Sequence, residues 1–199
     1  MATMGIEGRE ATPQFISTSR FARTTITFLR DHRGMKVYLC LLLGSLFAMA
    51  ETFPTLTTKN LSGTQVTLPA GFSGQKNLVL IAFERDQQKD VDTWLKVLPQ
   101  LQQAHPTMAY YELPTIKPMN VMVRFFIDNG MRGGIKDQQQ RARTITLYID
   151  KEPFKKALNL PSEDRIYALL LDKAGKVLWR SEGLYDEAKG KALAAALAQ

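Results

Sequence analysis

The chain has 199 residues, a net charge of +7 and a single cysteine. One cysteine excludes an internal disulfide and every mechanism that cycles through a pair of thiols. Residues 51–199 hold 20 Lys and Arg against 16 Asp and Glu, a net charge of +4, so part of the positive charge belongs to the first 50 residues. A balance of this size is typical of an ordinary soluble surface, and we expect no nucleic-acid partner.

Residues 35–50 have the pattern of a secretion signal. Met35-Lys36 precedes thirteen uncharged residues, 37–49, and the segment ends in Ala48-Met49-Ala50, a small-x-small cleavage site. The run is shorter than the about 20 apolar residues of a membrane-spanning helix, which favours cleavage after Ala50 over a permanent anchor. Cys40 lies at the start of the run, whereas a lipoprotein cysteine would follow it. We therefore expect a periplasmic or secreted protein without a thiol.

Residues 1–34 do not fit a compact signal, and two interpretations stay open. The natural start can be Met35, which would leave residues 1–34 untranslated. Alternatively the segment is an organellar transit peptide, because residues 15–30 are rich in Ser, Thr and Arg and lack acids. The Ala-x-Ala site favours bacterial export.

Residues 51–199 are enough for one domain with one buried core. Short β-prone pieces between turn residues predict an N-terminal hairpin over 51–74. The continuous apolar run Leu78–Phe83 predicts a strand buried on both faces. A helix follows, with Asp86 as its N-cap, and extends to Gln103 with a bend at Pro99.

The second half alternates strands and helices. Met108–Leu113 is the next expected strand, ended by prolines at 114 and 118. An amphipathic helix over 119–127 follows and is closed by Asn129-Gly130. Met131–Ile135 is expected to be a loop, and its glycines match no phosphate-binding motif. The remaining expected elements are a strand at 144–149, a short helix at 153–158, an antiparallel hairpin of 166–172 and 176–180, and a final helix capped by Asp186.

This order of elements, and the segment Ile166–Trp179 above all, resembles the thioredoxin fold with an N-terminal hairpin. The resemblance implies an α/β three-layer sandwich with a central mixed sheet and an N-terminal β-hairpin over residues 51–199. It also implies a redox cysteine after the strand that ends at Phe83, where Arg85–Lys89 stands, and a proline near Ile166, which is absent. We therefore expect no thiol oxidoreductase or peroxidase activity.

A narrower resemblance covers Asn77–Leu197. It rests on Phe83-x-Arg85, Trp94, Asn129–Arg132 and the series Tyr167, Asp172, Trp179 and Gly183. These features are similar to the thioredoxin-like family of mitochondrial ATP synthase assembly factors, which has bacterial relatives. The resemblance implies a protein that binds another protein, in the mitochondrial case a newly made subunit of the membrane sector. An exported relative need not share that client.

The first candidates for a partner site are Glu84, Arg85, Asp86 and Gln87. Polar residues at the carboxyl end of a central strand lie where α/β sheets place their binding sites. A helix cap at Asp86 and a surface ion pair explain them about as well.

Arg132, Arg141 and Arg143 are the second candidates, because guanidinium groups bind carboxylates and phosphates through a forked set of donors. The basic stretch 124–143 could face an acidic protein or lipid headgroups. A merely solvated face is the alternative.

The sequence thus predicts an exported, redox-inactive protein that acts by protein binding or as an assembly factor, on a client that can be membrane-associated. Trp94 and Trp179 are expected in the core. His105 has no partners at metal-ligand spacing, so we expect no metal and no cofactor. The alternative is a cysteine-independent enzyme at Glu84–Asp86. A pocket joining these residues with Arg132 and holding a carboxyl of raised pKa would favour the enzyme, and an open apolar patch rimmed by arginines would favour binding.

Overall fold

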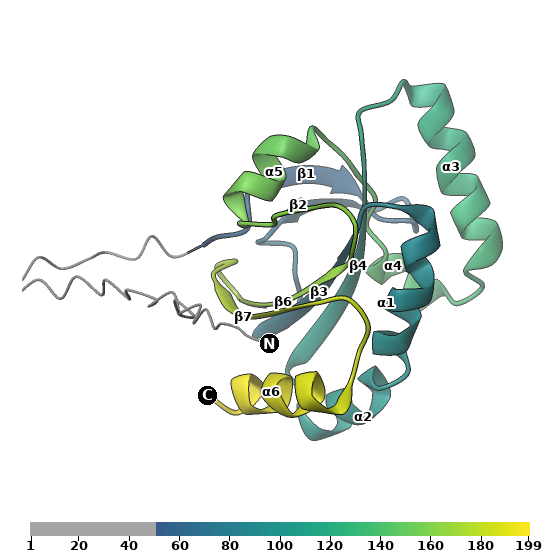
Figure 1. The fold of residues 1–199 in the computed structure, drawn as a ribbon. Coiled ribbons are helices and arrows are strands. Elements are labelled where there is room, and N and C mark those ends of the chain that lie inside the picture. Colours follow the sequence, from purple (N-terminus) through teal and green to yellow (C-terminus); the bar gives the residue numbers. More distant parts are fainter. Residues whose placement is uncertain (1–50) are drawn as a thin grey trace, which may run out of the picture. The chain divides into compact units, whose positions relative to one another are not determined.

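The computed structural model describes residues 51–199, so Cys40, the expected signal at 35–50 and the segment 1–34 lie outside the described residues. A five-stranded mixed sheet in the order β5-β4-β3-β6-β7 forms the centre (Figure 1). Its strands are β3 (Lys76–Ala82), β4 (Met108–Ile116), β5 (Leu147–Tyr148), β6 (Tyr167–Asp172) and β7 (Val177–Glu182). β3, β4 and β5 are parallel, and β6 is antiparallel to both β3 and β7.

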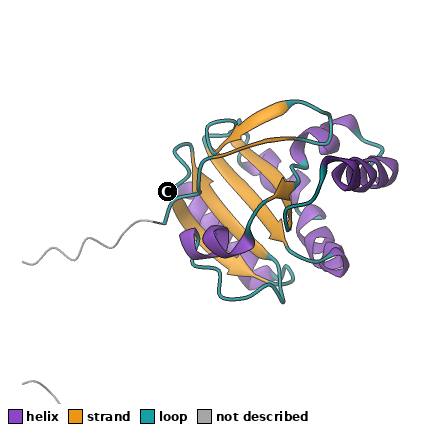
Figure 2. Cartoon of the chain, turned by 90° about the horizontal axis from the view of Figure 1, so that it is seen from above, coloured by secondary structure: helices purple, strands orange, loops and turns teal. Residues whose placement is uncertain are grey.

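Two layers cover the sheet, as Figures 1 and 2 show. One layer contains the helices α1 (Gln88–Leu95), α2 (Leu98–Ala104) and α6 (Glu187–Ala198). The other contains the antiparallel hairpin of β1 (Leu56–Lys59) and β2 (Gln65–Leu68), together with helix α5 (Lys151–Ala157). The three-layer α/β sandwich with an N-terminal hairpin is therefore confirmed.

Residues of β3 alternate between two hydrophobic cores. Val79 and Ile81 pack with Phe53 in the core under the hairpin and α5. Leu78 and Leu80 pack with Trp94 in the core under the helices. All four strand residues are 0% exposed, as expected for a strand buried on both faces. Trp94 is also fully buried, and its indole ring meets that of Trp179 edge to face at 6.1 Å.

Strand β4 is longer than the prolines predict. It passes through Pro114 and ends at Ile116. Pro114 is opposite Ala82, the last residue of β3, and pairing with β5 begins at Thr115. A proline in a strand costs least where a neighbouring strand ends, because the missing N–H is not needed there.

The expected single helix from Asp86 to Gln103 is three elements. A short 3₁₀ turn, η1 (Arg85–Gln87), leads into α1, and α2 follows after a break at residues 96–97. Asp86 lies inside the 3₁₀ turn, so the prediction that it is the N-cap was wrong. Pro99 is at the second position of α2, where a helix has no use for its N–H.

The region after β4 differs most from the prediction. Helix α3 (Val121–Gly134) continues through Asn129-Gly130 and takes in most of the expected loop. A second helix, α4 (Gln138–Arg143), follows, with the Asp137 side chain accepting hydrogen bonds from two of its first N–H groups. The expected strand over 144–149 is reduced to the two residues of β5.

The last hairpin and helix agree with the prediction. The turn between β6 and β7 contains Gly175 at φ +88°, a conformation that favours glycine. Helix α6 is capped by Asp186, whose carboxylate accepts the N–H of Lys189 at 2.8 Å. In residues 51–199, none of the helices combines the length and the apolar character needed to cross a bilayer.

Candidate functional site

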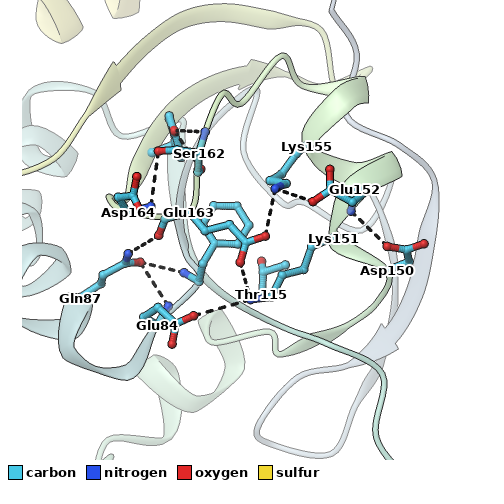
Figure 3. A network of polar contacts seen from close by, with 12 residues as sticks. Glu84, Gln87, Thr115, Asp150, Lys151, Glu152, Lys155, Ser162, Glu163 and Asp164 are labelled. Atoms are coloured by element: carbon cyan, nitrogen blue, oxygen red, sulfur yellow. Dashed lines mark hydrogen bonds and ion pairs between the residues drawn. The ribbon is translucent and has the colours of Figure 1, made fainter.

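Gln87 organises the carboxyl end of β3. Its side-chain oxygen accepts the backbone N–H of Phe83 at 2.8 Å and that of Glu84 at 3.3 Å. Its amide nitrogen donates to the carbonyl of Glu163 at 2.6 Å (Figure 3). Gln87 is 5% exposed, so these bonds satisfy polar groups that water does not reach freely. This side chain thus fixes the strand end to the loop before β6.

An open pocket of about 320 Å³ lies beside this strand end. It is lined by Glu84, Asp86, Gln87, Lys89, Asp90, Glu163 and Asp164. Five of these seven side chains are carboxylates and only one is basic. The pocket surface is therefore polar and acidic, a match for basic side chains on a partner.

Two lysines of α5 neutralise the inner wall of this pocket. Lys151 and Lys155 lie 2.8 Å and 3.0 Å from the Glu163 carboxylate, and Lys151 is 3.9 Å from Glu84 (Figure 3). The hydrogen bond from Lys151 is the largest cause that holds the pKa of Glu163 below its usual range. Glu163 is thus an ion-paired carboxylate, and the net negative charge of the pocket comes from its other acids.

The predicted arginines do not join this pocket. The Arg132 guanidinium donates to the carbonyl of Leu61 at 2.7 Å, and Arg141 donates to the carbonyls of Ile135 and Arg132 at 2.7 Å and 2.8 Å. Both side chains fasten α3 and α4 to neighbouring backbone.

Arg143 lies at the other end of the sheet. Its guanidinium stacks on the ring of Tyr110 at 4.5 Å. Tyr110 pairs with Leu78, which is six residues before Glu84. At about 3.3 Å per residue, Arg143 and Glu84 are therefore roughly 20 Å apart along the strands. The structure therefore separates the two predicted groups.

The strand-end candidates themselves differ in exposure. Glu84, Arg85 and Asp86 are exposed, whereas Gln87 is buried. Arg85 does not line the pocket that Glu84 and Asp86 share. Glu84, Asp86 and the pocket around them thus remain available to a partner, while Gln87 has a structural role.

Glu112 on β4 is a buried carboxyl that the sequence analysis missed. It is 4% exposed and accepts hydrogen bonds from Gln88 at 3.4 Å and Gln140 at 3.3 Å. Burial raises its pKa, and the two glutamine donors oppose that rise. The only available signal was an acid between Tyr111 and Leu113 in an apolar strand.

The pocket that would favour an enzyme is not formed. The carboxyl of raised pKa, Glu112, lies outside the lining of the strand-end pocket, and Arg132 lies outside it as well. Within residues 51–199, no group of three or more His, Cys, Asp and Glu could hold a metal ion. An open apolar patch is instead present on α3, where Val121, Met122, Phe125 and Phe126 are exposed.

Comparison with known proteins places the fold. No protein-family model matches the chain, and no curated protein does. Among solved structures, the thioredoxin domain of a thiol-disulfide oxidoreductase from Bacteroides vulgatus matches with a TM-score of 0.50 and 16% identity, over 74% of this chain and 96% of that one. A thiol:disulfide interchange protein from Bacteroides sp. also matches with a TM-score of 0.50, at 15% identity over 76% and 91% of the two chains.

A third match is a protein from Aquifex aeolicus that carries the provisional description of electron transport protein. It has a TM-score of 0.53 and 10% identity, over 75% of this chain and 98% of that one. The described domain has the thioredoxin fold. At these identities the likeness establishes the fold alone, and residues 51–199 contain no cysteine.

Proposed function

We propose that this protein is an exported thioredoxin-fold protein that acts by binding a protein client, as an assembly factor, and not by thiol chemistry. The observation that carries the proposal is Gln87. Its side chain takes up the space after β3 with three hydrogen bonds, in the segment where the resemblance to thioredoxins implies a redox cysteine. In this segment after β3, a glutamine side chain therefore holds the backbone in place, and no thiol is present.

The open pocket beside Gln87 is the surface we propose for the client. Glu84 and Asp86 are exposed on its rim, and the Glu84 side chain is 62% exposed. Their carboxylates would select a client segment that carries basic side chains. The similarity of Asn77–Leu197 to the ATP synthase assembly factors supports an assembly role, and the Ala48-Met49-Ala50 site supports export with cleavage after Ala50.

Affinity capture from an envelope fraction, followed by mass spectrometry, tests the client site. The bait is the protein from Glu51 onward, compared with a Glu84→Gln/Asp86→Asn variant. We expect the variant to lose the captured client while its melting temperature stays close to that of the parent, since both residues are exposed. Glu187→Gln, at an exposed position of α6, is the control and should capture the client normally.

Two further measurements test the rest of the proposal. N-terminal sequencing of the envelope-localised protein should begin at Glu51. Purified protein from Glu51 onward should neither reduce insulin disulfides nor consume peroxide, because methionine sulfur does not cycle through a disulfide. Equal client capture by the Glu84→Gln/Asp86→Asn variant would remove the pocket as the client site.

A further inference from the structure

Helix α3 exposes its apolar side chains. Val121, Met122, Phe125 and Phe126 are 82%, 70%, 58% and 67% exposed, and α3 has no buried residue. These four residues are spaced so that they share one face of the helix. Figure 1 shows α3 at the periphery of the domain. A cluster of this kind on an otherwise well-packed domain marks an interaction surface.

Three charged residues of α3, Arg124, Asp128 and Arg132, are on its inner side. Asp128 accepts a hydrogen bond from Tyr148 at 2.8 Å, and the Arg124 guanidinium lies 4.9 Å from the centre of the Tyr148 ring. Arg132 donates to the carbonyl of Leu61 at 2.7 Å. Polar contacts therefore hold α3 to the domain, and its apolar face is left for something outside it.

The positive charge of the domain is concentrated in the stretch of sequence that contains this helix. Residues 117–143 hold six Lys and Arg and two Asp and Glu, whereas the rest of residues 51–199 hold fourteen of each. The whole net charge of +4 thus belongs to this stretch. Lys117 precedes α3 and Lys136 follows it, and both are exposed. The occupant of the apolar face is therefore expected to be anionic.

We propose that α3 docks on an anionic lipid bilayer. Val121, Met122, Phe125 and Phe126 would enter the boundary between headgroups and acyl chains, and Lys117 and Lys136 would lie among the anionic headgroups. An amphipathic helix with a basic rim binds a lipid surface in this way.

The surroundings of α3 are compatible with a flat lipid surface. A Cβ atom added at Gly130, Gly133 or Gly134 would meet nothing within 4 Å, so no groove walls surround this end of the helix. A helix of fourteen residues, about 21 Å long, with one exposed apolar face can lie in the plane of a bilayer surface.

Vesicle sedimentation tests the proposal. The protein is produced from Glu51 onward, because residues 51–199 contain both hydrophobic cores and the apolar run 37–49 would itself bind lipid. It is mixed with vesicles of phosphatidylcholine and phosphatidylglycerol in equal parts, or of phosphatidylcholine alone. We expect binding to the anionic vesicles, which added salt weakens, and little binding to the neutral ones.

Variants with matched controls locate the surface. Phe125→Gln/Phe126→Gln should weaken binding to the anionic vesicles about tenfold or more. Leu184→Gln, at a residue 52% exposed, should not. Lys117→Glu/Lys136→Glu should weaken binding about fivefold or more, whereas Lys156→Glu/Lys191→Glu, with the same change in net charge at exposed positions, should have a smaller effect. Melting temperatures near that of the parent confirm that each variant is folded.

A Phe126→Trp variant gives a second readout. Its emission should shift to shorter wavelength with anionic vesicles, beyond any change in the parent, whose Trp94 is fully buried and whose Trp179 is half-buried. The proposal is overturned if the parent does not sediment with anionic vesicles, if Phe125→Gln/Phe126→Gln sediments equally well, or if neutral vesicles bind as strongly. Loss of a protein partner by that variant without any vesicle binding would assign the face to protein instead.

Discussion

The hydroxyl of Tyr148 donates a 2.8 Å hydrogen bond to the carboxylate of Asp128, and this bond joins β5 to the inner side of α3. It is one of the few side-chain contacts that fix a helix whose apolar residues face outward. Burial and the neighbouring Asp128 raise the pKa of Tyr148, so the hydroxyl keeps its proton well above the usual pH for a tyrosine.

Tyr148→Phe should loosen α3 without unfolding the domain. The variant removes a hydrogen bond to a charged group, which in general contributes about 1.5–3 kcal/mol to stability. The contribution here is smaller, because water competes for the bond at this surface. Backbone amides of α3 should exchange with deuterium faster, while those of β3 and β6 stay protected. Tyr110→Phe removes a hydroxyl but keeps the ring under Arg143, and it should leave exchange in α3 unchanged. Equal exchange in α3 of the parent and Tyr148→Phe would contradict this role.

Glu112→Gln should stabilise the protein at neutral pH. Burial raises the pKa of Glu112 in the folded state, so the folded protein holds this proton to a higher pH than the unfolded chain does. The free energy of unfolding therefore falls as pH rises from the ordinary glutamate pKa through the raised pKa of Glu112. Above the raised pKa the free energy of unfolding falls no further from this cause. The glutamine side chain does not ionise, so the variant does not lose stability in this way.

Urea unfolding at a series of pH values measures this effect. The parent should lose stability through that window relative to Glu112→Gln, by on the order of 1 kcal/mol at neutral pH. Glu187→Gln, at an exposed position, should follow the parent at every pH. Parallel pH profiles for the parent and Glu112→Gln would show that the carboxyl is not perturbed.

Gln87→Ala should destabilise the domain by about 2 kcal/mol or more. The variant leaves the buried N–H of Phe83 and the carbonyl of Glu163 without their partner. Gln139→Ala on α4, at an exposed position, should change stability by no more than about 0.5 kcal/mol. Thermal and urea unfolding compare the two. A small effect of Gln87→Ala would mean that the strand end is free to rearrange.

Gly175→Ala should cost more than Gly63→Ala, although both glycines have nearly the same φ, +88° and +87°. The shared part of the cost is the strain of a positive φ, about 1 kcal/mol or more. The excess comes from Pro69, whose Cγ would lie 2.6 Å from the new Cβ at position 175, whereas position 63 is open. Urea unfolding of both variants measures the difference, and equal losses would show that Pro69 moves aside freely.

Continuous runs of apolar residues made the central strands of the sheet predictable from the sequence. Leu78–Phe83 and Tyr167–Leu171 are apolar at nearly every position, which is typical of strands between two cores. The end of α3 was not predictable in this way, because glycine costs a helix only about 1 kcal/mol per residue. The contact of Arg132 with the carbonyl of Leu61, seventy-one residues away in sequence, holds its last turns.

The candidate site was only partly predictable. Binding sites of α/β sheets lie at the carboxyl ends of the strands, and this led to Glu84 and Asp86, which line the pocket. Pattern alone could not find Glu112, because its partners Gln88 and Gln140 come from two helices 24 and 28 residues away. It also could not show which way α3 faces, since an amphipathic period is the same whether the apolar side meets a core or a membrane.

The pairing of β3 with β6 has a consequence for the order of folding. Leu78 is opposite Leu170, ninety-two residues later, and both lie at the centre of the sheet. The middle of the sheet therefore cannot close until nearly the whole chain has been synthesised. Until then the apolar segments of β3 and β4 have no complete core to enter. A chain with this topology completes its core only late in synthesis, which would suit the export proposed above.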